Sequence, residues 1–116
     1  MAVWTKEDLR NDILEHIGRK SMSQTATAVD AAKVDAAIDA AYDQLDGFGL
    51  VPYSYDVIPE WAQPLLRDYV EPEIKPYYGI AVSDQEKQIA QWIARGKMVE
   101  QLAISNPQLP SAPEYF

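Results

Sequence analysis

The chain has 116 residues, of which 47% are hydrophobic and none is cysteine. This length suits one domain with a modest core, and the apolar content excludes a disordered chain. Ten Lys and Arg against eighteen Asp and Glu give a net charge of −8, which disfavours direct binding to nucleic-acid phosphates. A solubilising surface is the commonest reason for such a balance.

The absence of cysteine excludes disulfides, thiol catalysis and metal sites built on thiolates. No apolar run is long enough to span a bilayer, so we expect no membrane segment. The start, "MAVWTKEDLRND", lacks a basic segment followed by an apolar one, so we expect no signal peptide.

The first predicted helix runs from about Thr5 to Ile17. Thr5 is a suitable N-cap, and Leu9, Ile13 and Ile17 recur every four residues on one face. Gly18 supplies a C-terminal stop, and the polar segment "RKSMSQTATAV" that follows is predicted to be a loop.

The second predicted helix runs from about Asp30 to Leu45 and is rich in alanine, the best helix former. Asp46-Gly47 ends it. Its predicted buried face consists of Val34, Ile38, Ala41, Tyr42 and Leu45.

An extended segment, "GFGLVPYSYDV", follows the second helix. Val51, Tyr53, Tyr55 and Val57 alternate in it, which fits either a short strand or a packed connector. The sequence leaves both alternatives open.

The third predicted helix contains four prolines. Trp61, Leu65 and Tyr69 have helical spacing, and we expect a kinked helix from about Pro59 to Tyr77, closed by Gly79. The prolines are Pro59, Pro64, Pro72 and Pro76.

The fourth predicted helix starts at a capping box, "SDQE" at 83–86, in which Ser83 caps the helix and Glu86 reaches back. Gly96 costs about 1 kcal/mol relative to alanine and would allow close helix contact. The apolar positions that keep to one face are Ile89, Trp92, Ile93, Gly96, Val99 and Ala103.

The chain ends in "SNPQLPSAPEYF", where prolines recur every three residues as in a polyproline II helix. Such a stiff segment can dock elsewhere at low entropic cost, and the alternative is an ordinary disordered terminus. The residues of this predicted docking arm are Asn106, Pro107, Leu109, Pro110, Pro113, Tyr115 and Phe116.

The predicted fold class is therefore all-α. We expect a small bundle of about four helices with a long connector after the second helix. The helical domain spans residues 1–104, and an extended Pro-rich arm spans 105–116.

No motif indicates catalysis, a metal or a cofactor. His16 has no recognisable nucleophile or base partner, and "GFG" lacks the lysine of a phosphate-binding loop. Asp35, Asp39 and Asp43 follow one line of the second helix, without the loop spacing of a calcium site. That line is either the solvated back of the helix or a face that meets a basic partner or lines a space shared with other subunits.

Taken in chain order, these segments resemble the head-to-tail connector (adaptor or head-completion) proteins of tailed bacteriophages and gene transfer agents. The resemblance covers about residues 5–104 and lies in the pattern of elements. Its most family-like stretches are "AAYDQLDGFGL" and "IPEWAQPLLRDYVEPEIKPYYGI". The four prolines of the third segment are more than this family leads us to expect.

The resemblance implies a structural virion protein rather than an enzyme. Such proteins form a ring, usually of twelve copies, beneath the portal protein at the head–tail junction, after assembly in the host cytoplasm. The ring extends the channel through which double-stranded DNA passes without specific binding. It also presents a surface to a downstream tail or stopper protein, and a C-terminal segment often docks on the portal.

In such a ring, acidic subunits must be kept from repelling one another. We therefore expect basic residues to meet a neighbour's carboxylates, and some aromatic residues to lie where subunits meet. The basic candidates are Arg10, Arg19, Lys20 and Lys33, and the aromatic ones are Trp4, Tyr53, Tyr55, Tyr77 and Tyr78.

Two other functions remain open at this point. The first is a small acidic regulatory or adaptor domain, monomeric or dimeric, that binds a basic protein, and particle size separates it from a ring. The second is an enzyme that uses paired carboxylates such as Asp39 and Asp43, which would have to line an enclosed pocket.

Overall fold

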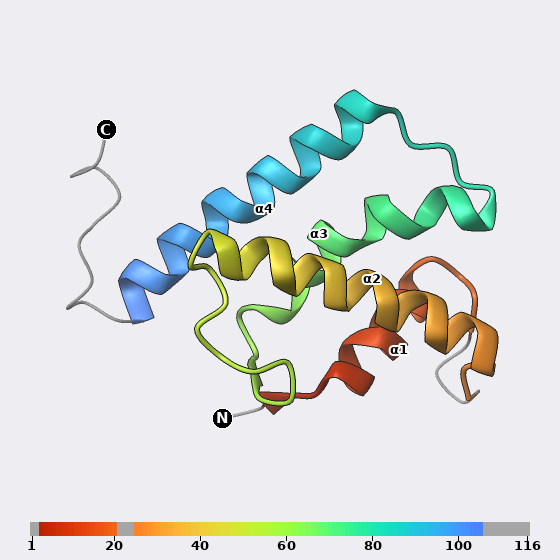
Figure 1. Cartoon of the computed structure of the whole chain (residues 1–116), viewed down its shortest axis with the longest axis horizontal. Coiled ribbons are helices and arrows are strands. Elements are labelled where there is room, and N and C mark those ends of the chain that lie inside the picture. The colour runs from red at the N-terminus through yellow and green to blue at the C-terminus, as the bar shows by residue number, and fades with distance from the viewer. Residues whose placement is uncertain (1–2, 21–24, 106–116) are drawn as a thin grey trace.

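Four α-helices and a short antiparallel strand pair make up the computed structural model, which describes residues 3–20 and 25–105 (Figure 1). The predicted all-α class and helix number are confirmed. The predicted docking arm, 106–116, lies outside the described residues. The elements are β1 (Val3–Trp4), α1 (Lys6–His16), α2 (Ala28–Gly47), β2 (Ile58–Pro59), α3 (Gln63–Ile74), the 3-10 helix η1 (Lys75–Tyr78) and α4 (Asp84–Ser105).

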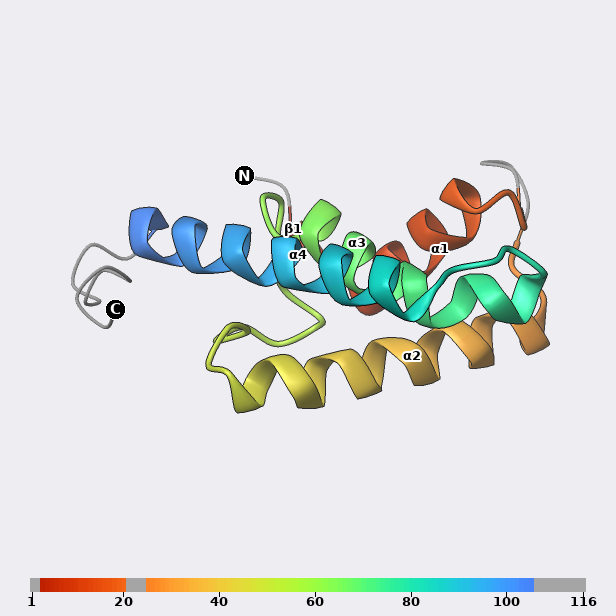
Figure 2. The ribbon, with the colours of Figure 1, turned by 90° about the horizontal axis from the view of Figure 1, so that it is seen from above.

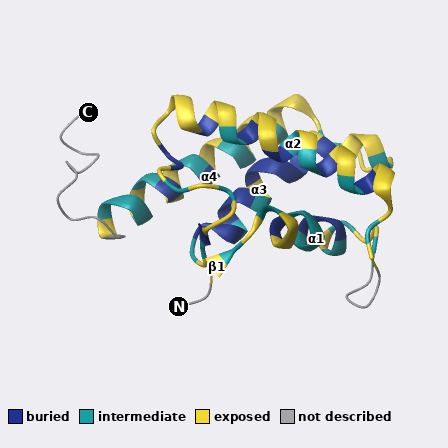
Figure 3. Ribbon diagram, turned by 60° about the horizontal axis from the view of Figure 1, so that its bottom comes forward, coloured by how far each residue is buried: buried dark blue, intermediate teal, exposed yellow. Residues whose placement is uncertain are grey.

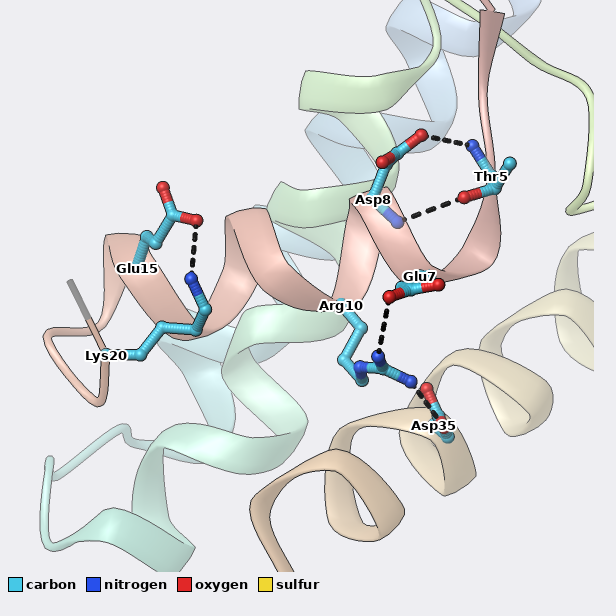
Figure 4. Close-up of polar contacts among 7 residues, drawn as sticks. All are labelled: Thr5, Glu7, Asp8, Arg10, Glu15, Lys20 and Asp35. Atoms are coloured by element: carbon cyan, nitrogen blue, oxygen red, sulfur yellow. Dashed lines mark hydrogen bonds and ion pairs between the residues drawn. The ribbon is translucent and has the colours of Figure 1, made fainter. Parts of the chain in front are cut away.

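Helix α1 has the predicted cap. The Thr5 hydroxyl accepts from the Asp8 N–H at 3.2 Å, and the Asp8 carboxylate accepts from the Thr5 N–H at 3.0 Å (Figure 4). Gly18 follows the helix at a φ of 81°, a left-handed conformation that glycine adopts without a steric penalty.

Helix α2 begins two residues before the predicted start, because the Thr27 hydroxyl accepts from the Asp30 N–H and caps the helix. Val34, Ile38, Ala41 and Leu45 are buried as predicted. Tyr42 is half-buried at the edge of the core.

The connector after α2 contains no strand over residues 50–57, so the packed alternative is correct. Tyr53 and Tyr55 both pack around Tyr42 instead of alternating between two faces. Ile58 and Pro59 then form β2, which pairs with β1 in the register Trp4 to Ile58 and Val3 to Pro59.

Helix α3 begins at Gln63, and the predicted start at Pro59 is wrong. Pro59 belongs to the strand pair, and its carbonyl accepts from the Ala62 N–H in a turn before the helix. Pro64 lies in the first turn, where its missing N–H costs nothing. The helix continues past Pro72 to Ile74, tightens into η1, and stops at Gly79, whose φ is 79°.

The core lies between α1, α2 and α3, and α4 packs mainly against α3 (Figures 1 and 2). Helices α2 and α4 run in the same general direction in both views. None of the described helices is long and apolar enough to cross a membrane. The fully buried large side chains are Leu9, Ile13, Leu14, Val34, Ile38, Leu45, Ile58, Leu66, Val70, Ile74 and Met98.

Candidate interaction surfaces

Helix α4 is apolar on two opposite sides. Ala94 and Met98 are its only buried residues among those whose side chains are described, and they face the core. Two residues turn a helix by about 200°, so Trp92 and Gly96 point almost directly away from Ala94. Trp92 is 70% exposed and Ile93 50% exposed. Most of the predicted apolar face therefore lies on the outside of the molecule, while Val99 is half-buried against the core.

Gly96 lies at the centre of this outward face. A Cβ atom added there would meet nothing within 4 Å. The close helix contact that the sequence suggested for Gly96 is therefore not made with the described part of the chain. Since glycine costs about 1 kcal/mol inside a helix, its presence has no explanation in the packing of one copy.

A shallow apolar groove runs beside this face, between α4 and the end of α2. It has a volume of about 500 Å³ and is lined by Phe48, Leu50, Trp92 and Val99. The Phe48 ring is 58% exposed, and the Arg95 guanidinium lies 4.8 Å from its centroid. Neither Phe48 nor Trp92 is among the aromatic residues predicted to lie at interfaces.

Figure 3 shows that much of α2 is exposed. Within the acidic line of this helix, Asp39 and Asp43 are exposed and Asp35 is half-buried. Asp35 accepts from Arg10 at 3.2 Å (Figure 4), and Asp39 pairs with Lys6 at 2.6 Å. The Asp39 side chain is 53% exposed, so it does not line the enclosed pocket that the carboxylate-enzyme alternative requires. Asp43 is exposed and borders a hollow that also contains Tyr42.

The hollow beside Asp43 has a volume of about 280 Å³ and is lined by tyrosines and carboxylates. The hydroxyls of Tyr42 and Tyr53 are buried there without a hydrogen-bond partner. Burial raises the pKa of Tyr53 to about 12 and also raises the pKa of Tyr42. Both groups are therefore neutral near physiological pH.

The four predicted interface cations all have contacts inside the described chain. Arg10 lies between Glu7 and Asp35, and Lys20 pairs with Glu15 at 3.0 Å (Figure 4). The Arg19 guanidinium stacks on the Tyr78 ring at 4.7 Å and lies 4.0 Å from Asp30. Lys33 differs from these three, since its ammonium lies 4.5 Å from the Tyr77 ring and has no described carboxylate partner. Their role between subunits stays a prediction.

Most of the predicted interface aromatics pack inside the chain. Tyr42, Tyr53, Tyr55 and Trp61 form an edge-to-face cluster with centroid separations of 5.3–6.5 Å. Trp4 is half-buried against the core.

Tyr77 and Tyr78 differ in exposure. The Tyr78 hydroxyl donates to Asp30 at 2.8 Å, and burial together with this bond raises the pKa of Tyr78 to about 12. Tyr77 is 53% exposed.

His16 also has a structural contact. Its Nδ1 lies 2.5 Å from the carboxylate of Glu71, a residue that is only 4% exposed. Lys75 at 3.6 Å and Arg67 at 3.9 Å reach the same carboxylate. The cluster joins α1 to α3 and to the start of η1, and these four residues include no serine, threonine or cysteine.

The described residues contain no group of three or more His, Cys, Asp or Glu side chains placed to hold a metal ion. Compared with known protein families, with curated proteins and with solved structures, the chain matches none of them. The resemblance to connector proteins therefore rests on the sequence pattern.

Proposed function

We propose that this chain is a structural subunit of a ring, of about twelve copies, that joins the portal of a tailed virus particle to its tail. The observation that carries the proposal is the outward apolar side of α4, where Trp92 is 70% exposed. The sequence pattern of the connector family supplies the identity of the assembly.

Exposed apolar area of this kind marks an interaction site, because leaving it in water is unfavourable. Trp92 and Val99 of α4 line one groove together with Phe48 at the end of α2, so this apolar surface is contiguous rather than scattered. Burying one large apolar side chain contributes about 1.5–3 kcal/mol, so a few such contacts suffice for association.

The charge of the chain supports the proposed channel. Asp43 and Asp46 are exposed and have no ion pair within the described chain. A ring built from copies with a net charge of −8 repels phosphate, so DNA passes without adhering.

One observation favours the regulatory-domain alternative. Exposed carboxylates of Asp43 and Asp46 surround the hollow in which the hydroxyls of Tyr42 and Tyr53 lack a partner. A lysine or arginine side chain of a basic protein would satisfy these groups.

Co-sedimentation with portal rings from the same particle tests the proposal. The samples are the full chain, a chain truncated after Ser105, and a Trp92→Asp variant. We expect the full chain to sediment with the portal, the truncation to bind at least tenfold more weakly, and Trp92→Asp to lose ring formation. If the full chain does not sediment with the portal, the connector proposal is wrong and the regulatory-domain alternative takes its place.

A further inference from the structure

An exposed stripe of α4 runs through Glu86, Ile89, Ile93 and Lys97, at intervals of three, four and four residues. These spacings place all four side chains on one side of the helix. Ile89 is 47% exposed and Ile93 50% exposed. Glu86 also closes the capping box of α4, while Lys97 has no ion pair with a described carboxylate.

This stripe faces away from α2 in the same copy. Ile93 and Lys97 line a hollow together with Asp68 and Pro72 of α3. Trp92, by contrast, lines the groove beside Phe48 at the end of α2. The Ile89–Ile93 edge is therefore on the other flank of α4.

A second exposed stripe runs along α2 through Lys33, Ala36, Ala40 and Asp43, at intervals of three, four and three residues. All four residues are exposed, and Lys33, Ala36 and Ala40 also line a hollow of about 270 Å³ beside Tyr69 and Glu73 of α3. Lys33 has no described carboxylate partner, and Asp43 has no described cation partner.

The two stripes complement each other when their helices run parallel. Lys33 and Asp43 are ten residues apart, about 15 Å along the helix, and Glu86 and Lys97 are about 16 Å apart. Each end then pairs opposite charges, Lys33 with Glu86 and Asp43 with Lys97.

The middle of each stripe also matches. Ile89 and Ile93 come opposite Ala36 and Ala40 in the same register. Bulky side chains on one helix fit against small ones on the other, which lets the two helices approach closely.

We propose that the α4 stripe of one copy packs parallel to the α2 stripe of the next copy. The inference rests on the proposed function, since it names one contact between neighbouring copies of that ring, in addition to the groove that contains Trp92. The contact is heterologous, because it joins two different surfaces, and repeating it produces a closed ring when the rotation between copies closes. Since α2 and α4 already run the same way within one copy (Figure 1), a small rotation between neighbours keeps them parallel.

Engineered cysteines test this contact, because the natural chain has none that would interfere. The double variant carries Ala40→Cys and Ile93→Cys, and each single variant is a control. A matched negative pair is Ala40→Cys with Glu60→Cys, since Glu60 is exposed and lies outside both stripes. All are full-length chains, oxidised alone and with portal rings, and separated on denaturing gels without reductant.

We expect the double variant to give a ladder of covalent multimers beyond the dimer. A mixture of the two single variants should stop at the dimer, and each single variant alone should remain monomeric. Dimers from Ile93→Cys alone would overturn the proposal, because α4 would then meet α4.

The mass of the unoxidised assembly separates this inference from the proposed function. Rings that form without the ladder overturn the α2–α4 pairing and leave the connector function standing. No assembly in either condition overturns both.

Charge reversal gives a second test that does not depend on disulfide geometry. Lys97→Glu should weaken assembly about tenfold, because it sets a carboxylate against Asp43 of the next copy. Adding Asp43→Lys to the same chain should restore assembly. If the double variant is as weak as Lys97→Glu alone, the proposed pairing is wrong.

Discussion

At the scale of single residues, Glu71 is the most constrained charged group of the described chain. Its carboxylate is almost fully buried, and His16 of α1, Arg67 of α3 and Lys75 of η1 surround it. A buried charge stays ionised only when such partners compensate for the lost water. The sequence gives no local signal for this cluster, since His16 and Glu71 are far apart in the chain. It depends on how α1 and α3 pack.

We expect Glu71→Ala to reduce the free energy of unfolding by about 2–4 kcal/mol, because it leaves the facing cations partly buried without their carboxylate. Urea denaturation measures this change. Asp68→Ala is the matched control, because Asp68 is a half-exposed partner of Arg67, and it should cost under about 1 kcal/mol. Equal losses for both variants would show that burial of Glu71 has no special role.

We expect the free energy of unfolding to fall at alkaline pH, because three tyrosines have raised pKa values in the folded state. Burial raises the pKa values of Tyr42, Tyr53 and Tyr78 above the ordinary tyrosine value of 10.0, and those of Tyr53 and Tyr78 reach about 12. The folded state therefore holds these protons more tightly than the unfolded state. Their contribution is complete below about pH 10 and is lost as the pH rises through about 12.

Unfolding midpoints measured from pH 8 to 12 check this expectation. Above pH 10, the unfolding midpoint of the Tyr53→Phe variant should fall less steeply with pH than that of the natural chain. The reason is that one of the three buried tyrosine hydroxyls has been removed. An identical slope in Tyr53→Phe and the natural chain would contradict the assigned cause.

At the scale of elements, the two faces of α4 have different roles: one packs in the core, and the other is available for contact with a second copy. Met98 is fully buried, whereas Ile93 on the other side is half exposed. The two residues have similar size, so equivalent truncations compare the two faces of one helix.

We expect Met98→Ala to cost about 2–4 kcal/mol in the free energy of unfolding, because it opens a cavity in the core. Ile93→Ala should cost under about 1 kcal/mol in the monomer and should weaken assembly. Denaturation and analytical ultracentrifugation of the same samples measure the two effects. Comparable stability losses for both variants would contradict the outward orientation of Ile93.

Gly96→Ala also tests the outward face of α4, but here we expect the monomer to become more stable. The added methyl group meets nothing within 4 Å, so the substitution should stabilise the monomer by about 0.5–1 kcal/mol. Thermal unfolding measures it. A destabilised monomer would mean that Gly96 has a packing role within one copy.

The sequence predicts the elements better than it predicts their surroundings. Thr5, Gly18, Ser83 and Gly79 mark helix ends through local chemistry, and the structure confirms each of them. The start of α3 could not be predicted, because Pro59 fits a helix start equally well and only its pairing with Val3 decides. The periodicity of the sequence locates the apolar face of α4, but it does not show whether that face packs in the core of the same chain. In the structure, a second and narrower face made by Ala94 and Met98 packs in the core.

At the scale of the whole molecule, the chain has one core and more apolar surface than that core uses. Exposed large apolar residues occur on α4, at the end of α2 and on η1, as Ile89, Trp92, Phe48 and Tyr77 show. Acidic residues on α2 lie among them and are partly neutralised by α1. Subunits of a ring need both features, because neighbours must adhere while the channel must not hold DNA.

The mass of the assembled full-length chain tests the central claim most directly. Native mass spectrometry and analytical ultracentrifugation, with and without portal rings, should detect a species near twelve times 13.0 kDa. The Trp92→Asp variant should remain a folded monomer under the same conditions. A natural chain that stays monomeric at every concentration, with portal rings present, would contradict the ring and favour the small acidic regulatory domain that binds a basic protein.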